Sequence, residues 1–514
     1  MRIRISRPRS RNLVAAAAVV ALLATAACDD QPAGASSATG TTLALAIQGT
    51  PNSFDPTQLV DGQQTYVWNS LYDTLLITDN KGQLQPGAAK SWKYSDDART
   101  LTLKLREGMT FSTGSEVDSA AVKATLDRIR TTPGPNQAGL SAVESVETPD
   151  ARTVVLELPH PDGALLHRLS GPAGVIGDPK TLTAKRTALN PVTSGPYTLD
   201  KGATVNGSVY VLKRREDYWD KKAYPFRTVK IRVIADRTAA VNALKSGEIN
   251  AGSVEVTQAG TLKSAGFHVK HVAATAAGNL VLADRAGKVL KPLADIRVRK
   301  AINMAFDREK IVKQILQGSG KPTEQILNPK GQGHDAALDH TYSYDPAAAK
   351  KLLTEAGYPG GFRVTMPSLI FTKPFEATIT QSLADIGIKV KWQTVPPQQN
   401  VSALTSKKYP IIFFLEGLNT DPVMTQISFA PGGARNMFGS TDPQLTKLMD
   451  RAAGKTDPAK AADIYRQINS FTVRNAWNAP VFYVGTYWAT KKGITYLGDG
   501  SSTVSTIRQF GVSG

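Results

Sequence analysis

The sequence predicts a fold in which strands and helices mix along the whole chain, so its class is α/β or α+β. Segments in which apolar residues alternate, typical of strands, recur from residue 42 onward. Segments with apolar residues at helical spacing lie between them. The chain has 514 residues and no internal repeat. This length exceeds the size at which single hydrophobic cores stop growing, and we therefore expect two or three subdomains.

The first predicted strand is TLALAI at residues 42–47, where leucine and isoleucine alternate with smaller residues. Further strands are predicted at residues 101–106, 153–158, 208–213, 229–234, 388–395 and 411–415. They are spread over most of the chain, which favours more than one sheet.

The clearest helix is predicted to begin after Asp345, an N-cap residue, with Pro346 at the first helical position. An apolar face follows, and Gly357 ends the helix. Asp457 and Pro458 open another helix by the same logic. Apolar residues at helical spacing predict further helices around residues 122–129, 241–244 and 298–306.

The N-terminus resembles a bacterial lipoprotein signal. Five arginines precede an apolar run too short to span a bilayer as a helix, and Cys28, the single cysteine of the chain, follows this run directly. The resemblance implies that residues 1–27 are removed and that Cys28 is acylated, which anchors the protein to the outer face of the cytoplasmic membrane. Thr25 departs from the leucine usual in such signals. The alternative is a buried free cysteine just inside a membrane anchor.

Residues 28–40 contain few apolar residues and are expected to form a flexible tether. A coil of about a dozen residues lets the folded part stand roughly 20 Å from its anchor. Because Cys28 is the only cysteine, the mature chain is expected to form neither a disulfide nor a thiolate metal site.

The formal net charge is +18, and removing residues 1–27 takes away five arginines and no acidic residue, which lowers it to +13. Lysines and arginines are scattered instead of forming a basic run. No zinc-finger, RNA-binding or helix-turn-helix signature accompanies them. We therefore expect a solvated basic surface and no nucleic-acid partner.

The search for catalytic motifs finds no nucleophile elbow, no Ser-x-x-Lys pair, no His-Glu-x-x-His and no phosphate-binding loop. His268 and His271 are three residues apart in a probable strand and point to opposite faces. His334 and His340 are expected to be solvated. The sequence thus predicts neither an enzyme nor a bound cofactor or metal.

Ten short segments stand out in order between residues 52 and 388. They are NSFDP (52–56), YDTLL (72–76), LQPGAAKSW (84–92), LKLREGMTF (103–111), SGPY (194–197), DYW (217–219), SGEI (246–249), VRKAINMAFDR (298–308), LLTEAGY (352–358) and IGI (386–388). In order and spacing they resemble the family 5 extracytoplasmic solute-binding proteins, the receptors of peptide, nickel and related ABC importers. Arg215, Asn250 and Ala121 depart from the family pattern at positions expected to be scaffold.

The resemblance implies a two-lobed, periplasmic-binding-protein-like α/β fold of type II that closes by a hinge, with an extra subdomain in the first lobe. Applied to this chain, lobe one comprises residues 41–75, 191–282 and 487–514, the extra subdomain residues 76–190, and lobe two residues 283–486. The implied partners are a small solute, an ABC permease with its ATPase subunits, and the membrane through the N-terminal lipid. The resemblance also implies a monomer.

Ligand contacts are expected in the loop before Pro422. In peptide-binding relatives an aspartate there holds the peptide ammonium group, because a buried cation needs a fixed counter-charge. Leu418 occupies about that position here, so an ordinary peptide with a free amino terminus is put in doubt. Glu416 and Asp421 are possible substitutes, with Asn419 between them.

Other candidates are expected around the cleft between the lobes. Lys373 falls near a basic residue that holds the peptide carboxylate in relatives, although a solvated loop lysine is the competing interpretation. The remaining candidate contacts, for which packing in the core or rim is the competing interpretation, are Asp61, Trp68, Arg435, Asn436 and Trp488.

The first functional hypothesis is a lipid-anchored receptor of an ABC importer. It captures a peptide or peptide-like solute in the cleft by hinge closure and delivers it to the permease. The alternative hypothesis is a lipid-anchored extracytoplasmic sensor or interaction protein on the same fold.

Overall fold

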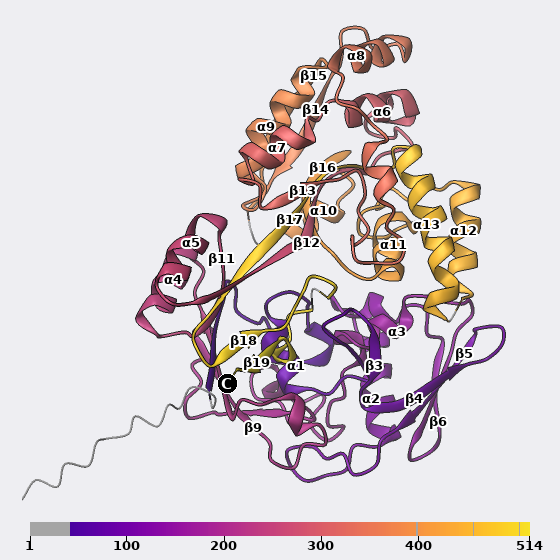
Figure 1. The fold of residues 1–514 in the computed structure, drawn as a ribbon. Helices are drawn as coiled ribbons and strands as arrows, with labels where there is room; N and C mark the ends of the chain where they lie inside the picture. Colours follow the sequence, from indigo (N-terminus) through magenta and orange to yellow (C-terminus); the bar gives the residue numbers. More distant parts are fainter. Residues whose placement is uncertain (1–41, 397–398, 456, 503, 514) are drawn as a thin grey trace, which may run out of the picture. The chain divides into compact units, whose positions relative to one another are not determined.

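A computed structural model of the protein describes residues 42–396, 399–455, 457–502 and 504–513. The predicted signal, the acylation site at Cys28 and the predicted tether lie outside the described residues. In the described part, strands and helices alternate as the sequence predicts, so the α/β class is confirmed (Figure 1). No helix in these ranges is both long enough and apolar enough to cross a bilayer.

The first sheet has the order β1-β10-β9-β8, with β1 and β10 parallel. Its strands are β1 (Thr42–Ile47), β8 (Tyr197–Leu199), β9 (Val209–Arg214) and β10 (Thr228–Val233). Leu43, Leu45 and Ile47 are fully or almost fully buried, which is the pattern that predicted β1. The other pairs in this sheet are antiparallel.

A second four-stranded sheet lies within residues 89–157, with the order β4-β5-β7-β6. Its strands are β4 (Ala89–Tyr94), β5 (Thr100–Leu105), β6 (Ser145–Asp150) and β7 (Thr153–Glu157), accompanied by the hairpin β2 (Leu76–Thr78) and β3 (Leu84–Pro86) and by helices α2 (Ser119–Thr131) and α3 (Leu165–Arg168). Its buried side chains, such as Leu103 and Val154, belong to the same apolar core as Leu43 and Ile231 of the first sheet.

The third sheet contains two unusually long strands, β12 (His268–Leu282) and β17 (Ala479–Thr490). Both pair with each other along their length, as Figure 1 shows. At one end β17 pairs with β11 (Ala251–Val254), and at the other end β12 pairs with β16 (Ile411–Gly417) and β17 with β13 (Gly320–Pro322). The register shifts between Val272 and Ala276, so the pairing of the two strands passes through an irregular step.

The remaining elements pack around the two ends of this sheet. They are α1 (Thr65–Leu71), α4 (Arg237–Ser246), α5 (Val256–Ser264), α6 (Ile296–Met304), α7 (Arg308–Gln314), α8 (Pro346–Glu355), β14 (Phe362–Ser368), α9 (Lys373–Ala384), β15 (Ile388–Thr394), α10 (Asn400–Thr405), α11 (Asp421–Phe429), α12 (Pro443–Ala453), α13 (Pro458–Arg474), β18 (Ile494–Tyr496) and β19 (Phe510–Val512). Helices α4 and α5 share one core with Ala489. Helices α6 to α9 share another with Phe413, and α11 to α13 a third.

The predicted helix boundaries are confirmed where a capping residue marks them. The Asp345 side chain accepts a hydrogen bond of 2.8 Å from the Ala348 amide, and Gly357 ends the helix at a positive φ of 89°. Asp457 caps α13 in the same way. Gly247 ends α4 in the left-handed conformation that glycine adopts without strain.

The predicted lobe boundaries at 282/283 and 486/487 fall at the end of β12 and inside β17. Strands from both predicted lobes therefore share one sheet. The division into lobes stays a prediction, and the shared pair of long strands is the structural link between them.

Candidate ligand-binding site

Three of the short sequence segments converge in the first core. The Asp73 carboxylate accepts a hydrogen bond of 2.5 Å from the Tyr218 hydroxyl, and the Trp219 indole nitrogen lies 3.4 Å from both of its oxygens. The Asp73 amide donates to the Ser194 hydroxyl at 2.9 Å. Desolvation by burial raises the pKa of Asp73 to about 6, although these hydrogen bonds oppose the shift. These three segments therefore form part of the scaffold.

Asp61 lies in the turn between a short 3-10 helix (Pro56–Gln58) and α1. Its side chain is exposed and forms no hydrogen bond or ion pair with any described residue. Desolvation by the surrounding protein raises the pKa of its carboxyl to about 6. An accessible and unpaired carboxylate can take a cationic partner from outside the chain.

Trp68 lies in α1, which follows this turn, and is 1% exposed. Its indole nitrogen donates a hydrogen bond of 2.9 Å to the carbonyl oxygen of Val60, the residue before Asp61. In this structure Trp68 therefore packs in the core and fixes the turn that carries Asp61, so the packing interpretation describes it better than direct ligand contact.

Glu416 and Arg435 form one ion pair. The Arg435 Nε and Nη2 atoms donate to the two carboxylate oxygens of Glu416, the second at 3.2 Å. The Arg435 guanidinium lies 4.1 Å above the ring of Phe414, which packs edge-on against Phe371 at 5.2 Å. The side chains of Arg435 and Glu416 are 14% and 6% exposed, so each compensates the other in a largely desolvated place.

Lys373 lies at the first position of α9, two residues after Phe371. It is exposed, and its ammonium has no ion-pair partner among the described residues. The contact between Phe371 and Phe414 thus links the segment before Lys373 to the strand that carries Glu416, which lies opposite Ala277 of β12. The three side chains together carry a net charge of +1.

Asp421 and Asn419 flank the start of α11. The Asp421 Oδ2 atom accepts a hydrogen bond of 2.7 Å from the Gly333 amide, and its Oδ1 atom is buried without a hydrogen-bond partner in the described structure. Desolvation raises the pKa of Asp421 against these backbone hydrogen bonds. Asn419 is half-buried and accepts from the Thr420 amide at 2.9 Å. Asp421 therefore holds the loop around Gly333 and offers no accessible carboxylate here.

Asn436 has a structural role, against the prediction of a ligand contact. It is 0% exposed, its amide nitrogen donates to Phe429 O and Ser440 O, and its Oδ1 accepts from Ser440 N and from Arg285. All its hydrogen-bonding capacity is used inside the protein. The sequence pattern could not reveal the hydrogen bond from Arg285, which lies 151 residues away, although Phe429 and Ser440 are close in sequence.

Trp488 lies on β17 and stacks on Tyr496 with ring centroids 4.5 Å apart and an interplanar angle of 14°. Phe510 and Tyr66 pack edge-on against it at 5.3 and 6.5 Å. The residue is half-buried in an aromatic cluster, so only part of its ring is available to a ligand.

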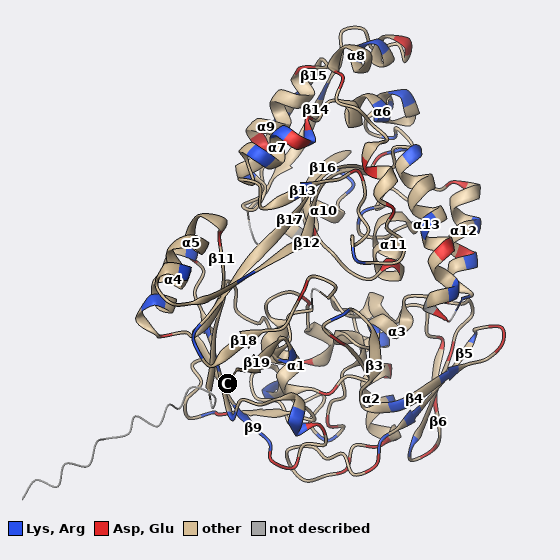
Figure 2. Ribbon diagram, viewed as in Figure 1, with Lys and Arg blue, Asp and Glu red and all other residues tan. Residues whose placement is uncertain are grey.

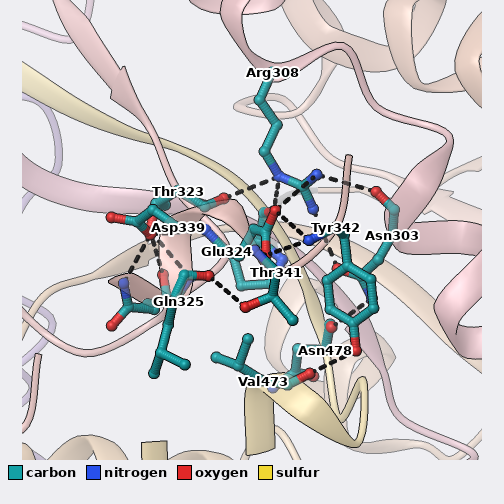
Figure 3. Close-up of polar contacts among 12 residues, drawn as sticks. Asn303, Arg308, Thr323, Glu324, Gln325, Asp339, Thr341, Tyr342, Val473 and Asn478 are labelled. Atoms are coloured by element: carbon teal, nitrogen blue, oxygen red, sulfur yellow. Dashed lines mark hydrogen bonds and ion pairs between the residues drawn. The ribbon is translucent and has the colours of Figure 1, made fainter. Parts of the chain in front are cut away.

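A buried polar network in residues 323–342 was not anticipated from the sequence (Figure 3). Arg308 donates to Thr323 O and Pro480 O, and its Nη1 atom lies 3.7 Å from Glu324 Oε1. Glu324 also accepts from the amides of Thr341 and Tyr342. Desolvation raises the pKa of Glu324 and lowers that of Arg308. The network fixes this segment onto α7 and β17.

His334 belongs to the same segment, and the expectation that it is solvated is wrong. Its side chain is 14% exposed, and its Nε2 atom lies 3.6 Å from Asp339 Oδ2 and 3.3 Å from the Gln325 amide nitrogen. His340, by contrast, is exposed as expected. Within the described ranges no group of three or more potential metal ligands comes together.

Two hollows of about 670 and 200 Å³ lie along α12 and none of the predicted ligand residues lines them. The smaller one includes Pro161 from the second sheet region and Trp477. Basic and acidic positions are interspersed over helices and strands in Figure 2, in agreement with the scattered charges of the sequence. The charge pattern therefore does not single out a nucleic-acid surface.

Comparison with known proteins identifies the family. The sequence model of the bacterial extracellular solute-binding proteins, family 5 Middle, matches residues 83–438, more than half of the chain. The chain belongs to this family. The resemblance inferred from the ten short segments is thus confirmed, and this family 5 protein belongs with the solute-binding proteins of ABC importers and not with enzymes.

The family 5 chain has curated relatives over most of its length. It is 27% identical over 448 residues to the glutathione-binding protein GsiB of Shigella dysenteriae serotype 1 (strain Sd197), a match that covers 82% of this chain and 85% of the relative. It is 26% identical over 446 residues to GsiB of Escherichia coli (strain K12), with the same coverage.

Solved structures agree with the family 5 assignment. The binding protein AgaA of A. tumefaciens R10, in complex with agropinic acid, has a TM-score of 0.79 and 26% identity, covering 92% of this chain and 99% of its own. DppA of Helicobacter pylori, in complex with the peptide STSA, has a TM-score of 0.76 and 22% identity, covering 92% and 98%. The two-lobed periplasmic-binding fold of type II is therefore confirmed.

Proposed function

We propose that this chain is the lipid-anchored receptor of an ABC importer, held at the outer face of the cytoplasmic membrane through Cys28. It captures a peptide or peptide-like solute between its two lobes and delivers the solute to a permease. The N-terminal pattern of arginines, apolar run and Cys28 supports the anchor. Tethering raises the local concentration of receptor at the permease without any new contact.

The observation that carries the proposal is the pair of long strands β12 and β17. They pair with β11 at one end and with β16 at the other, and their register changes between Val272 and Ala276. Two connecting strands with an irregular step join two parts while allowing rotation between them. Such rotation encloses a ligand and gives the permease a closed form that differs from the open one.

The proposed ligand class is supported by the candidate charged residues and by the relatives. Leu418 is fully buried beside Ala277 and Tyr483, so no carboxylate stands where peptide-binding relatives hold the ammonium group. Glu416 is already paired with Arg435. We propose that Lys373 and Arg435 attract an anionic group of the solute and that Asp61 attracts a cationic one, while Asn419 and Trp488 contribute polar and aromatic contacts.

Relatives named for glutathione, agropinic acid and a short peptide support a small solute that carries carboxylate and amide groups. The test is a binding screen on the purified protein with di- to pentapeptides, glutathione, opine-type amino acid derivatives and metal chelates. Thermal shift identifies the compounds that bind. Calorimetry then measures saturable binding, and solution scattering measures the radius of gyration. We expect saturable binding accompanied by a smaller radius of gyration.

Two results of these measurements would contradict the proposal or part of it. If no compound raises the unfolding temperature, and mass spectrometry of the denatured protein finds no co-purified solute, an import receptor for this class of solute is excluded. Binding without any compaction would retain the receptor but reject closure as its mechanism.

A further inference from the structure

The segment that follows β18 contacts a loop of the other predicted lobe. The Asn328 side-chain nitrogen donates to the carbonyl oxygens of Gly500 and Ser501 at 3.2 and 3.4 Å. Beside it, Lys330 Nζ lies 3.0 Å from Asp499 Oδ2. Residues 499–501 and 328–330 thus meet through hydrogen bonds and one ion pair, at a sequence separation of more than 160 residues.

The loop carrying Asn328 is held firmly on its own side. Asn328 is 3% exposed, and its Oδ1 atom accepts from the Lys330 amide at 3.0 Å, which places the lysine for its ion pair. The Tyr483 hydroxyl donates to Leu327 O at 2.6 Å. On the other side of the turn, the Gly333 amide is bonded to Asp421 at 2.7 Å. A contact made by this loop therefore acts on predicted lobe two, to which the loop belongs.

The segment carrying Asp499 is equally fixed. Its carboxylate accepts from the Ser501 amide at 2.9 Å. Partial burial raises the pKa of Asp499, but the hydrogen bond from Ser501 and the ammonium of Lys330 outweigh this effect and lower it. A Cβ atom at Gly82 would come within 2.6 Å of Ser501 O, so the hairpin between β2 and β3 also packs closely on the segment.

This contact lies at the irregular step of β12. A Cβ atom at Gly500, where φ is 92°, would lie 2.8 Å from Ala274 O and 3.0 Å from Val272 Cγ1. From the other side, a Cβ atom at Gly485 of β17 would lie only 2.1 Å from Val272 O. Two glycines therefore let the C-terminal segment and β17 approach the same stretch of β12 from both sides.

We propose that the contact between residues 499–501 and Asn328 with Lys330 is a third connection between the lobes, a pivot beside β12 and β17 that restricts their motion to one closing rotation. The proposal rests on the proposed two-lobed, closing receptor. Two connecting strands alone permit twisting and splaying as well as closure. A fixed contact at the axis removes those motions, so less conformational entropy is lost when a ligand closes the lobes.

The test uses the ligand-free protein, so its result is independent of whether a solute has been identified. Asn328→Ala removes the hydrogen bonds across the contact. Lys330→Met and Asp499→Asn remove the ion pair while keeping the aliphatic stem of the lysine and the acceptor for Ser501. Lys90→Met is the matched control, because Lys90 forms a similarly exposed ion pair, with Glu107 at 3.8 Å, within the second sheet.

Hydrogen exchange is measured on residues 499–502, 272–276 and 484–486, together with the solution scattering profile. We expect hydrogen exchange about two- to tenfold faster at all three places in Asn328→Ala, because the variant loses the hydrogen bonds to Gly500 and Ser501. A smaller effect is expected in the two ion-pair variants, because each loses only one exposed ion pair. The scattering curve is expected to show a broader distance distribution, and Lys90→Met to match the wild type.

Faster exchange confined to residues 499–502, with unchanged hinge peptides and scattering, would reduce the contact to local packing and overturn the proposal. Because Asn328 is buried, Asn328→Ala can unfold the protein globally. In that case the exposed pair Lys330→Met and Asp499→Asn decides, and wild-type exchange at residues 272–276 in both variants rejects the pivot.

Discussion

The Tyr218 hydroxyl donates a hydrogen bond of 2.5 Å to the buried carboxylate of Asp73, across 145 residues of sequence. None of the described lysines, arginines or histidines forms an ion pair with this carboxylate, and its other close partner is the Trp219 indole nitrogen at 3.4 Å. Burial therefore dominates and raises the pKa of Asp73 to about 6. This hydrogen bond thus joins Asp73 to Tyr218. Because burial disfavours the charged form of the carboxyl, the free energy of unfolding depends on pH.

The burial of Asp73 predicts a pH dependence for stability. The pKa of Asp73 is about 6 in the folded protein and near 3.8 without burial, so between these values the folded state binds more protons than the unfolded state. Stability therefore falls as pH rises from about 4 to 6, by up to about 3 kcal/mol. Asp73→Asn is expected to remove this dependence of stability on pH. Because the variant also loses a hydrogen-bond acceptor for Trp219, its stability is expected to shift at every pH.

Urea unfolding at pH 4 to 8 measures this difference. Asp96→Asn, a change at an exposed carboxyl, is the control and should keep the wild-type slope. Parallel curves for the wild type and Asp73→Asn would show that Asp73 does not titrate in this range.

The strands and helices with local signals were predicted correctly, and the long-range roles of side chains were not. β1 shows its alternation in six residues, and α8 has both its cap and its stop in the sequence. The middle of β12, residues 273–278, is composed of small residues and shows no alternation, so its continuous run of 15 residues was missed. The structural role of Asn436 was not predicted, because its hydrogen bond from Arg285, 151 residues away, leaves no signal in the local sequence.

A second prediction concerns the buried pair of Glu416 and Arg435. Removing one partner leaves a charge uncompensated in a place where both side chains are under 15% exposed. We expect Arg435→Met and Glu416→Leu each to destabilise the protein by about 3 kcal/mol. The double variant should recover most of that loss, because it buries apolar groups of similar size, and yet it should bind an anionic solute more weakly.

Thermal or urea unfolding of the two single variants and the double variant forms the cycle that measures the coupling. Additive losses would show that the pair is solvated in solution. Recovered stability with unchanged ligand affinity would place the pair outside the binding site.

A third prediction concerns Asp61 and the ligand. If its carboxylate receives a cationic group, binding weakens as pH falls through about 6, because the protonated carboxyl carries no charge. Asp61→Asn is expected to lower affinity about tenfold or more at pH 8 and to remove the pH dependence. Calorimetry at pH 5 and 8 with the ligand from the screen tests both points. Equal affinities for the wild type and Asp61→Asn at pH 8 would exclude the contact.

A fourth prediction concerns Gly485 at the step between β12 and β17. A methyl group there would lie 2.1 Å from Val272 O, so the strands must separate in Gly485→Ala. We expect a loss of about 1 to 3 kcal/mol in unfolding free energy and impaired compaction on ligand binding. Gly360→Ala is the control, because a Cβ atom there meets nothing within 4 Å. If Gly485→Ala has the same free energy of unfolding as the wild type, the two strands separate at this step without a loss of stability.

The fifth prediction separates anchoring from binding. Cys28 precedes the predicted tether, a segment poor in apolar residues, so replacing its sulfur is not expected to affect the folded lobes. Cys28→Ser should therefore keep the ligand affinity of the purified protein while reducing its recovery in the membrane fraction and the uptake of solute by cells. The loss of uptake follows from dilution of the receptor away from the permease. Overexpression of the variant should restore part of the uptake by mass action, whereas a defect in docking would persist at any concentration. A purified Cys28→Ser protein with weakened ligand binding would show that the cysteine acts on the folded lobes.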